Sequence, residues 1–68
     1  MVDDEDEDVL KAAGLVFDEG FDFFYSGQSD KALTAFREAY GIYRRAGVNE
    51  GQTDCLLYIA MSSAMRAG

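Results

Sequence analysis

Residues 24–36, FYSGQSDKALTAF, place one glycine and five polar residues between two apolar runs. Gly27 is expected to end a helix, because glycine readily adopts the left-handed conformation that closes a last helical turn. Ser29 is expected to begin the next helix as its N-cap. Ala32 and Phe36 follow at a four-residue spacing, which puts them on one helical face. The stretch therefore predicts a tight helical hairpin.

Three helices are expected, at about residues 9–25, 30–46 and 50–68, separated by glycine-containing breaks in a chain without proline. The third helix should begin with Asn49 as the N-cap and Gln52 as its partner in a capping box. Because the connections are short, neighbouring helices should lie antiparallel. The expected fold class is all-α: an antiparallel helical hairpin plus a third helix.

Small residues indicate where the first two helices cross. Gly20 lies seven residues before Gly27, and Ala32 lies five residues after it. The two should therefore face each other in the hairpin and let the backbones approach closely. Phe23 and Phe36 should then fill the space on either side of that contact.

The order of these residues resembles the tetratricopeptide repeat, whose pattern is W-x2-L-G-x2-Y…A-x3-F…P over about 34 residues. Val16, Glu19 and Arg44 stand where that pattern has Trp, Leu and Pro. The resemblance covers roughly residues 16–46 and implies a right-handed stack of helices of the tetratricopeptide type. The matching small and aromatic positions, which have a structural role at the helix crossing, are Gly20, Phe23, Gly27, Ala32, Phe36 and Ala39.

The third helix resembles the start of a second repeat. An offset of 41 residues aligns Phe17 with Tyr58 and Gly20 with Met61, a period similar to that of longer variants of the repeat. Since glycine is replaced by methionine, the second unit is expected to pack differently. The chain also stops where a repeat would turn, and repeat arrays normally end in a helix with a polar outer face. We therefore expect the apolar third helix to be covered by another chain, unless the molecule is a fragment.

The resemblance also implies a binding face. In tetratricopeptide proteins the first helices of successive repeats line a concave groove that takes peptides or helices. An aromatic and methionine-lined groove suits a hydrophobic or amphipathic helix. For each phenylalanine, ordinary core packing is the alternative interpretation. Carried over by position, the expected partner-binding residues are Phe17, Phe21, Phe24, Tyr58, Ser62 and Met65.

The net charge of −7 comes almost entirely from one segment. Residues 3–8 read DDEDED, and the remaining seven acidic residues are nearly balanced by six basic ones. Like charges at this density repel one another and stay hydrated. The sequence therefore predicts an acidic disordered tail at residues 1–8 and a three-helix domain at residues 9–68.

Several functions find little support in the composition. The chain has no histidine and a single cysteine, so no metal site, cofactor or catalytic residue is expected, and the protein is not expected to be an enzyme. Its scattered bases disfavour nucleic-acid binding. No apolar run approaches the length of a membrane span, and the acidic N-terminus is unlike a signal peptide. A soluble, cytoplasmic protein is the expectation.

Two functions from different classes stay open at this point. The first is an interaction module whose exposed apolar helix faces mediate self-association, or docking as a small subunit of a larger complex. The second is a monomeric adaptor that binds a peptide or amphipathic helix in the aromatic groove. The short chain with an uncovered last helix favours self-association, because a domain this small buries little surface and needs a further source of stability such as oligomerisation.

Overall fold

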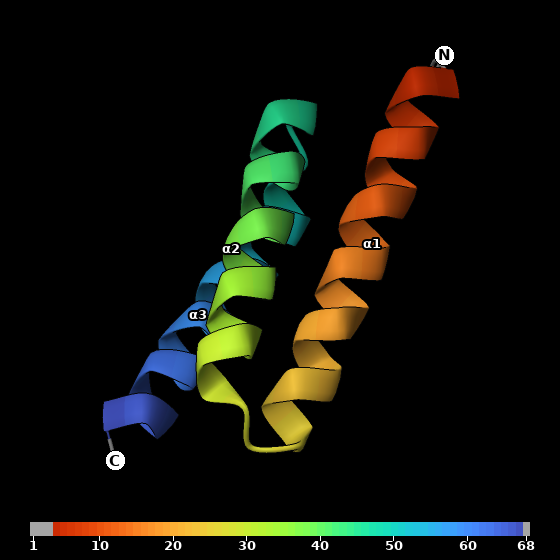
Figure 1. Cartoon of the computed structure of the whole chain (residues 1–68). Helices are drawn as coiled ribbons and strands as arrows, with labels where there is room; N and C mark the ends of the chain where they lie inside the picture. Colours follow the sequence, from red (N-terminus) through yellow and green to blue (C-terminus); the bar gives the residue numbers. More distant parts are fainter. Residues whose placement is uncertain (1–3, 68) are drawn as a thin grey trace.

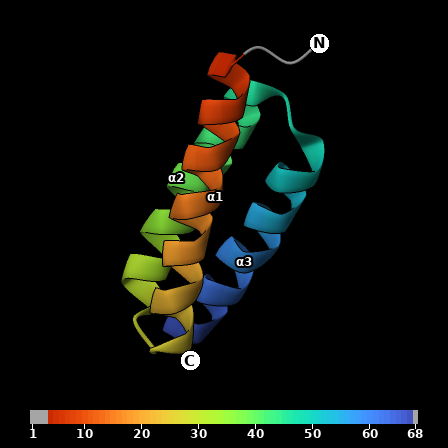
Figure 2. The same cartoon turned by 90° about the vertical axis from the view of Figure 1, so that its right-hand side faces the viewer.

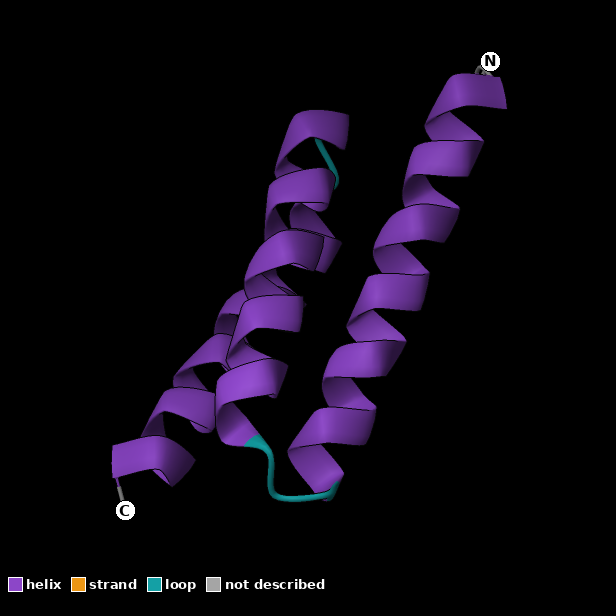
Figure 3. Ribbon diagram, viewed as in Figure 1, coloured by secondary structure: helices purple, strands orange, loops and turns teal. Residues whose placement is uncertain are grey.

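Three α-helices make up the part of the chain that the computed structural model describes, residues 4–67, with side chains described from 7 to 66. They are α1 (Asp4–Tyr25), α2 (Ser29–Ala46) and α3 (Asn49–Ala67), and Figure 3 shows helices and connecting loops only. The predicted all-α class is therefore confirmed. Within these residues, no helix combines the length and the apolar character needed to span a membrane.

The middle helix, α2, holds the fold together. It runs antiparallel to α1 and to α3, and it packs against both, whereas the backbones of α1 and α3 stay farther apart (Figures 1 and 2). The predicted hairpin plus third helix is thus the observed arrangement. Its Cα atoms span 45 × 18 × 12 Å. A body this thin, close to one helix diameter, cannot enclose every helix on all sides.

Glycines close both helical turns as predicted. Gly27 and Gly47 have φ values of 83° and 74°, in the left-handed region. After α1, the amide of Gln28 donates to the Phe23 carbonyl at 2.8 Å. After α2, the amide of Val48 donates to the Tyr43 carbonyl at 3.0 Å. Both are Schellman motifs, in which glycine avoids the strain that a side chain would meet.

The helix starts differ from the sequence-based predictions. Helix α1 begins at Asp4, inside the segment predicted to be a disordered tail, while residues 1–3 lie outside the described residues. Acidic residues favour a helix N-terminus, where backbone amides carry partial positive charge, and this attraction competes with their mutual repulsion. Gln28, rather than Ser29, caps α2, and it does so without a side-chain hydrogen bond.

Helix α3 also begins one residue early, at Asn49. The side chain of Gln52 donates to the Val48 carbonyl at 3.2 Å, so it does not form the predicted capping box. The Gln52 backbone amide donates to the same carbonyl at 3.2 Å. The Val48 carbonyl, just before the helix, therefore accepts both the first backbone hydrogen bond of α3 and the Gln52 side-chain hydrogen bond.

Small side chains dominate the core. Ala13 of α1 and Cys55 of α3 are fully buried against α2. Such small side chains allow helix axes to approach closely, and they leave the larger apolar residues to fill a few positions between the helices. Phe36 is the largest fully buried side chain. The buried residues of α2 are Ala32, Leu33, Ala35, Phe36 and Ala39.

The side chain nearest to Gly20 is the ring of Phe36, one of the two phenylalanines predicted to lie beside the helix crossing. A Cβ atom on Gly20 would lie 2.6 Å from Phe36 Cε1 and 2.8 Å from Cδ1. Helical side chains lean toward the N-terminus of their own helix. The ring of Phe36 therefore lies over the turn that contains Ala32, and Gly20 leaves room for it on the opposite helix.

A second glycine plays the same role between α2 and α3. A Cβ atom on Gly51 would lie 2.5 Å from Cδ1 and Cγ of Tyr43. Phe36 and Tyr43 are seven residues apart on α2 and therefore share one side of that helix. From that side Phe36 contacts Gly20 of α1, and Tyr43 contacts Gly51 of α3. The sequence alone does not indicate that Gly51 makes a close contact.

Candidate functional site

Four aromatic rings from all three helices form a compact group, which we call the aromatic cluster: Phe17, Phe21, Phe36 and Tyr58. The shortest centroid separation is 4.5 Å, between Phe21 and Tyr58. Phe17 lies 5.4 Å from Phe36 and 5.6 Å from Tyr58. Phe36 and Tyr58 lie 5.4 Å apart in a stacked arrangement. Side chains of α1 and α3 therefore meet over α2, although their backbones stay apart.

The aromatic cluster contains three of the predicted partner-binding residues, Phe17, Phe21 and Tyr58. Each is half-buried, and each packs against other rings of the aromatic cluster. Edge-to-face aromatic pairs contribute about 0.5–1.5 kcal/mol beyond their buried area. These residues hold α1 and α3 together, so the core-packing interpretation accounts for most of their contacts.

Phe24 and Tyr25 extend the aromatic cluster toward the end of α1. Phe24 is half-buried, and its ring centroid lies 6.2 Å from that of Tyr58. Tyr25 is 78% exposed and stacks beside Phe21 at 6.0 Å. Phe23, predicted to flank the helix crossing, is half-buried with Lys31 Nζ 5.7 Å from its ring centroid.

Ser62 does not lie on an accessible groove, contrary to its predicted place among the partner-binding residues. Its side chain is fully buried, and its Oγ has no hydrogen-bond partner among the described residues. Met65, the last predicted groove residue, is 42% exposed. The inward side of α3 is thus built from Gly51, Cys55, Tyr58 and Ser62, and three of these four residues are small.

The larger apolar residues of α3 point away from α2. Leu56 is 52% exposed, Leu57 is 56% exposed and Met61 is 40% exposed, and Ala60 and Ala64 are exposed between them. At 100° per residue these side chains share one side of the helix, opposite the inward residues. We call this surface the outer face of α3: Leu56, Leu57, Ala60, Met61 and Ala64.

The outer face of α3 carries no charge. Residues 55–65 contain no Asp, Glu, Lys or Arg, so the nearest charged residues of α3 are Asp54 at one end and Arg66 at the other. Arg66 Nε lies 3.1 Å from Asp30 Oδ1 in an ion pair whose side chains are both more than half exposed. A contiguous apolar surface without charge is the type that marks contact sites on small proteins.

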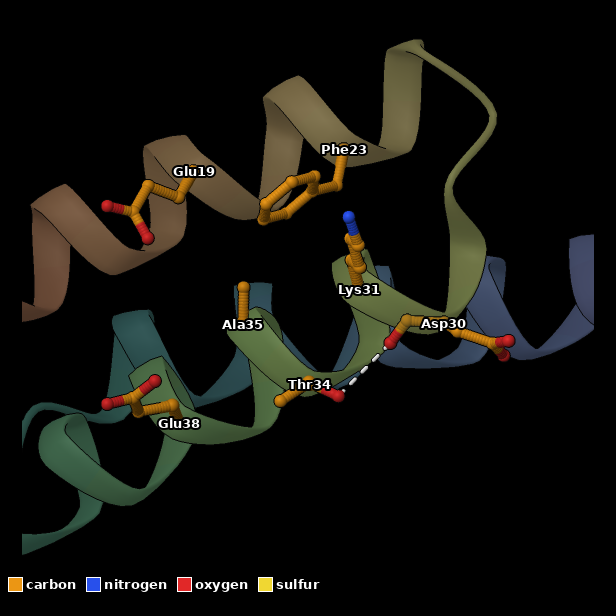
Figure 4. A pocket seen from close by; sticks show the side chains of 7 residues that line it. All are labelled: Glu19, Phe23, Asp30, Lys31, Thr34, Ala35 and Glu38. Carbon is orange, nitrogen blue, oxygen red and sulfur yellow. Dashed lines mark hydrogen bonds between the residues drawn. The ribbon is translucent and has the colours of Figure 1, made fainter.

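A shallow hollow between α1 and α2 is chemically different. It is lined by charged residues of both signs together with Phe23, Thr34 and Ala35 (Figure 4). Thr34 Oγ1 donates to the Asp30 carbonyl of its own helix at 3.1 Å. The lining residues are mostly exposed, and their contacts are local, so the hollow lacks the convergent polar groups of a ligand site. Its charged residues are Glu19, Asp30, Lys31 and Glu38.

The ionisable group with the largest shift is structural. Burial, with a smaller contribution from Asp54, raises the pKa of the Cys55 thiol to about 11. The pKa of Tyr43 is also raised, first by burial and then by the charges of Cys55, Asp18 and Asp54. A thiol held protonated is a weak nucleophile, so Cys55 acts as a small apolar core residue.

Comparisons of this chain with protein-family models, with curated proteins and with solved structures give no match. The resemblance to the tetratricopeptide repeat therefore rests on residues 16–46 alone and stays a prediction.

Proposed function

We propose that this protein is an interaction module that associates with itself through the outer face of α3. The observation that carries the proposal is the exposure of this face: Leu56, Leu57 and Met61 are each at least 40% exposed. In a monomer these large apolar side chains stay in contact with water, while the smaller Cys55 and Ser62 are buried. The monomer therefore lacks the stability that burying the larger side chains would provide. Covering the face in an oligomer would recover part of it, at about 25 cal/mol per Å² of apolar surface buried.

The alternative, a monomeric adaptor with an aromatic groove, has weaker support. The rings of Phe17, Phe21 and Tyr58 already contact one another and Phe36, so little of their surface is free for a ligand. The outer face of α3 has no such internal partner. Docking as a subunit of a larger complex would use the same outer face, with a different protein in place of the second copy.

Two leucine variants test the proposal. Leu57→Glu places a charge in the centre of the outer face, whereas Leu15→Glu places the same charge on α1, at a leucine that is 68% exposed. Light scattering coupled to size exclusion should give an oligomer mass for the native chain and for Leu15→Glu. Leu57→Glu should give the monomer mass of 7.5 kDa.

The circular dichroism of both variants should stay helical, because both leucines are exposed. A native chain that is monomeric at all concentrations would contradict the proposal. An equal loss of mass in both variants would also contradict it, since the effect would then come from added charge and not from the outer face.

A further inference from the structure

The outer face of α3 has an internal order of residue sizes. Leu57, Ala60, Met61 and Ala64 follow at the spacing i, i+3, i+4 and i+7, so they form one stripe along the helix. Large and small side chains alternate along it: leucine, alanine, methionine, alanine. All four are exposed. In a two-fold symmetric pair, a stripe of this kind can be complementary to itself in only one direction.

We infer that the occupant of the outer face is the α3 helix of a second copy, lying antiparallel across a two-fold axis near residues 60 and 61. The inference rests on the proposed function and specifies its geometry. In this arrangement residue numbers of facing positions add up to about 121. Leu57 then faces Ala64 of the other copy, and Met61 faces Ala60 of the other copy. Each large side chain meets a small one, which fills the space between the helices.

A parallel pair fits the same stripe poorly. In register, Leu57 would face its own copy and Met61 would face its own copy, while the two alanine levels would be left with a gap. Facing small residues leave voids, and facing large residues push the axes apart, so both features cost packing energy. The closed two-fold contact also limits assembly to a dimer, because the same surface is used on both copies.

The charges at the two ends of α3 favour the same direction. The N-terminal end carries Glu50 and Asp54, and the C-terminal end carries Arg66. An antiparallel pair brings the acidic end of one helix to the basic end of the other and aligns the helix dipoles oppositely. A parallel pair would bring Asp54 beside its own copy. Arg66 can keep its ion pair with Asp30, because both side chains of that pair are exposed and the guanidinium stays accessible.

The acidic end of α1 does not oppose this contact. α3 and α1 lie on different sides of α2 in Figure 1, where the N-terminus of α1 and the C-terminus of α3 are at opposite ends of the molecule. The outer face itself contains no charged residue. Two chains with a net charge of −7 each can therefore approach through α3 with their most acidic segments apart.

Disulfide cross-linking between single-cysteine substitutions tests the direction. A residue near the two-fold axis links to its own copy, whereas a residue away from the axis does not. Leu57 and its copy would be separated by seven residues along the paired axes, or about 10 Å, which exceeds the Cα separation of about 7 Å that a disulfide spans. Ala60 and its copy would be offset by one residue only.

Under mild oxidation, Ala60→Cys should form covalent dimers, and Leu57→Cys should form none above the level of the native chain. The double variant Leu57→Cys with Ala64→Cys should regain cross-linking, at least about tenfold above Leu57→Cys alone, because its cysteines face each other. The native chain is the control, since Cys55 is buried and should not link.

The result that overturns the inference is efficient linking of Leu57→Cys to itself, which indicates parallel helices, or no linking in any variant of a protein that is dimeric by light scattering. In both cases self-association, and with it the proposed function, would stand. A monomeric native chain would instead remove the proposed function together with the inference.

Discussion

The contact between Gly20 and Phe36 leads to a quantitative prediction for Gly20→Ala. The new methyl carbon would lie 2.6 Å from Phe36 Cε1, 2.8 Å from Cδ1 and 3.0 Å from Cζ. Phe36 is fully buried, and its ring is held by Phe17, Phe21 and Tyr58 at centroid distances of 5.4–5.7 Å. The ring therefore has no free volume into which it can move, and α1 must shift away from α2.

Two effects of opposite sign set the magnitude. Overpacking of a close-packed core costs about 1–3 kcal/mol. Replacing glycine by alanine inside a helix contributes about 1 kcal/mol in favour of folding, because the unfolded chain loses freedom and the helix propensity rises. The net change for Gly20→Ala is therefore a loss of about 0–2 kcal/mol in the free energy of unfolding.

Gly14→Ala, on the same helix, is the matched control. No atom among the described residues lies within 4 Å of the methyl position, apart from the glycine's chain neighbours and its own helix. It receives the propensity gain alone and should be stabilised by about 1 kcal/mol. The difference between the two variants isolates the packing cost and should be about 1–3 kcal/mol.

The measurement is urea unfolding followed by helical circular dichroism, with all chains at one protein concentration because association adds to apparent stability. If Gly20→Ala is as stable as Gly14→Ala, Phe36 does not pack against Gly20 as described, and the crossing of α1 and α2 must be built in another way.

Three further predictions concern α3. Gly51→Ala should lower the free energy of unfolding by about 1–3 kcal/mol relative to Gly41→Ala, because Gly51 lies under a tyrosine ring and Gly41 does not. Urea unfolding of both variants measures this difference, and equal stabilities would contradict the prediction. The Cys55 thiol ordinarily loses its proton near pH 9.0, whereas in the fold its pKa is about 11. The contribution of the protonated thiol to stability is therefore complete below pH 9 and falls by about 2–3 kcal/mol between pH 9 and 11. The free energy of unfolding of Cys55→Ala should lack this decrease. If the variant and the native chain show the same pH profile, the thiol is not buried as described. Ser62→Ala should raise stability by about 1 kcal/mol more than Ser63→Ala, since it removes a buried hydroxyl without a described partner; an equal effect of the two would indicate that the hydroxyl is satisfied.

Much of the fold follows from local rules that a sequence displays. Gly27 and Gly47 end helices because each turn needs a left-handed residue, and this requirement depends on neighbours in the chain alone. The start of α1 was harder to predict. At Asp4 the attraction of acidic side chains to a helix N-terminus opposes the repulsion among those side chains. The two effects are similar in size, so the sequence does not indicate which one prevails.

The candidate site was less predictable, because it depends on which residues face each other. The third helix was expected to be apolar and covered by another chain, but its pattern does not indicate which side is exposed, because apolar residues lie on every side of it. Ser62 was misplaced, because alignment by a 41-residue offset assumes that α3 packs as α1 does. Instead α3 turns Gly51, Cys55 and Ser62 inward, since small residues allow it to lie close to α2.

The central claim, that the outer face of α3 joins two copies of the chain, is tested most directly by the mass of the native protein as a function of concentration. Sedimentation equilibrium over a dilution series should show a reversible transition between the 7.5 kDa chain and a species of about twice that mass, the closed dimer expected of a two-fold contact. A single species with the mass of one chain at every concentration would contradict the claim.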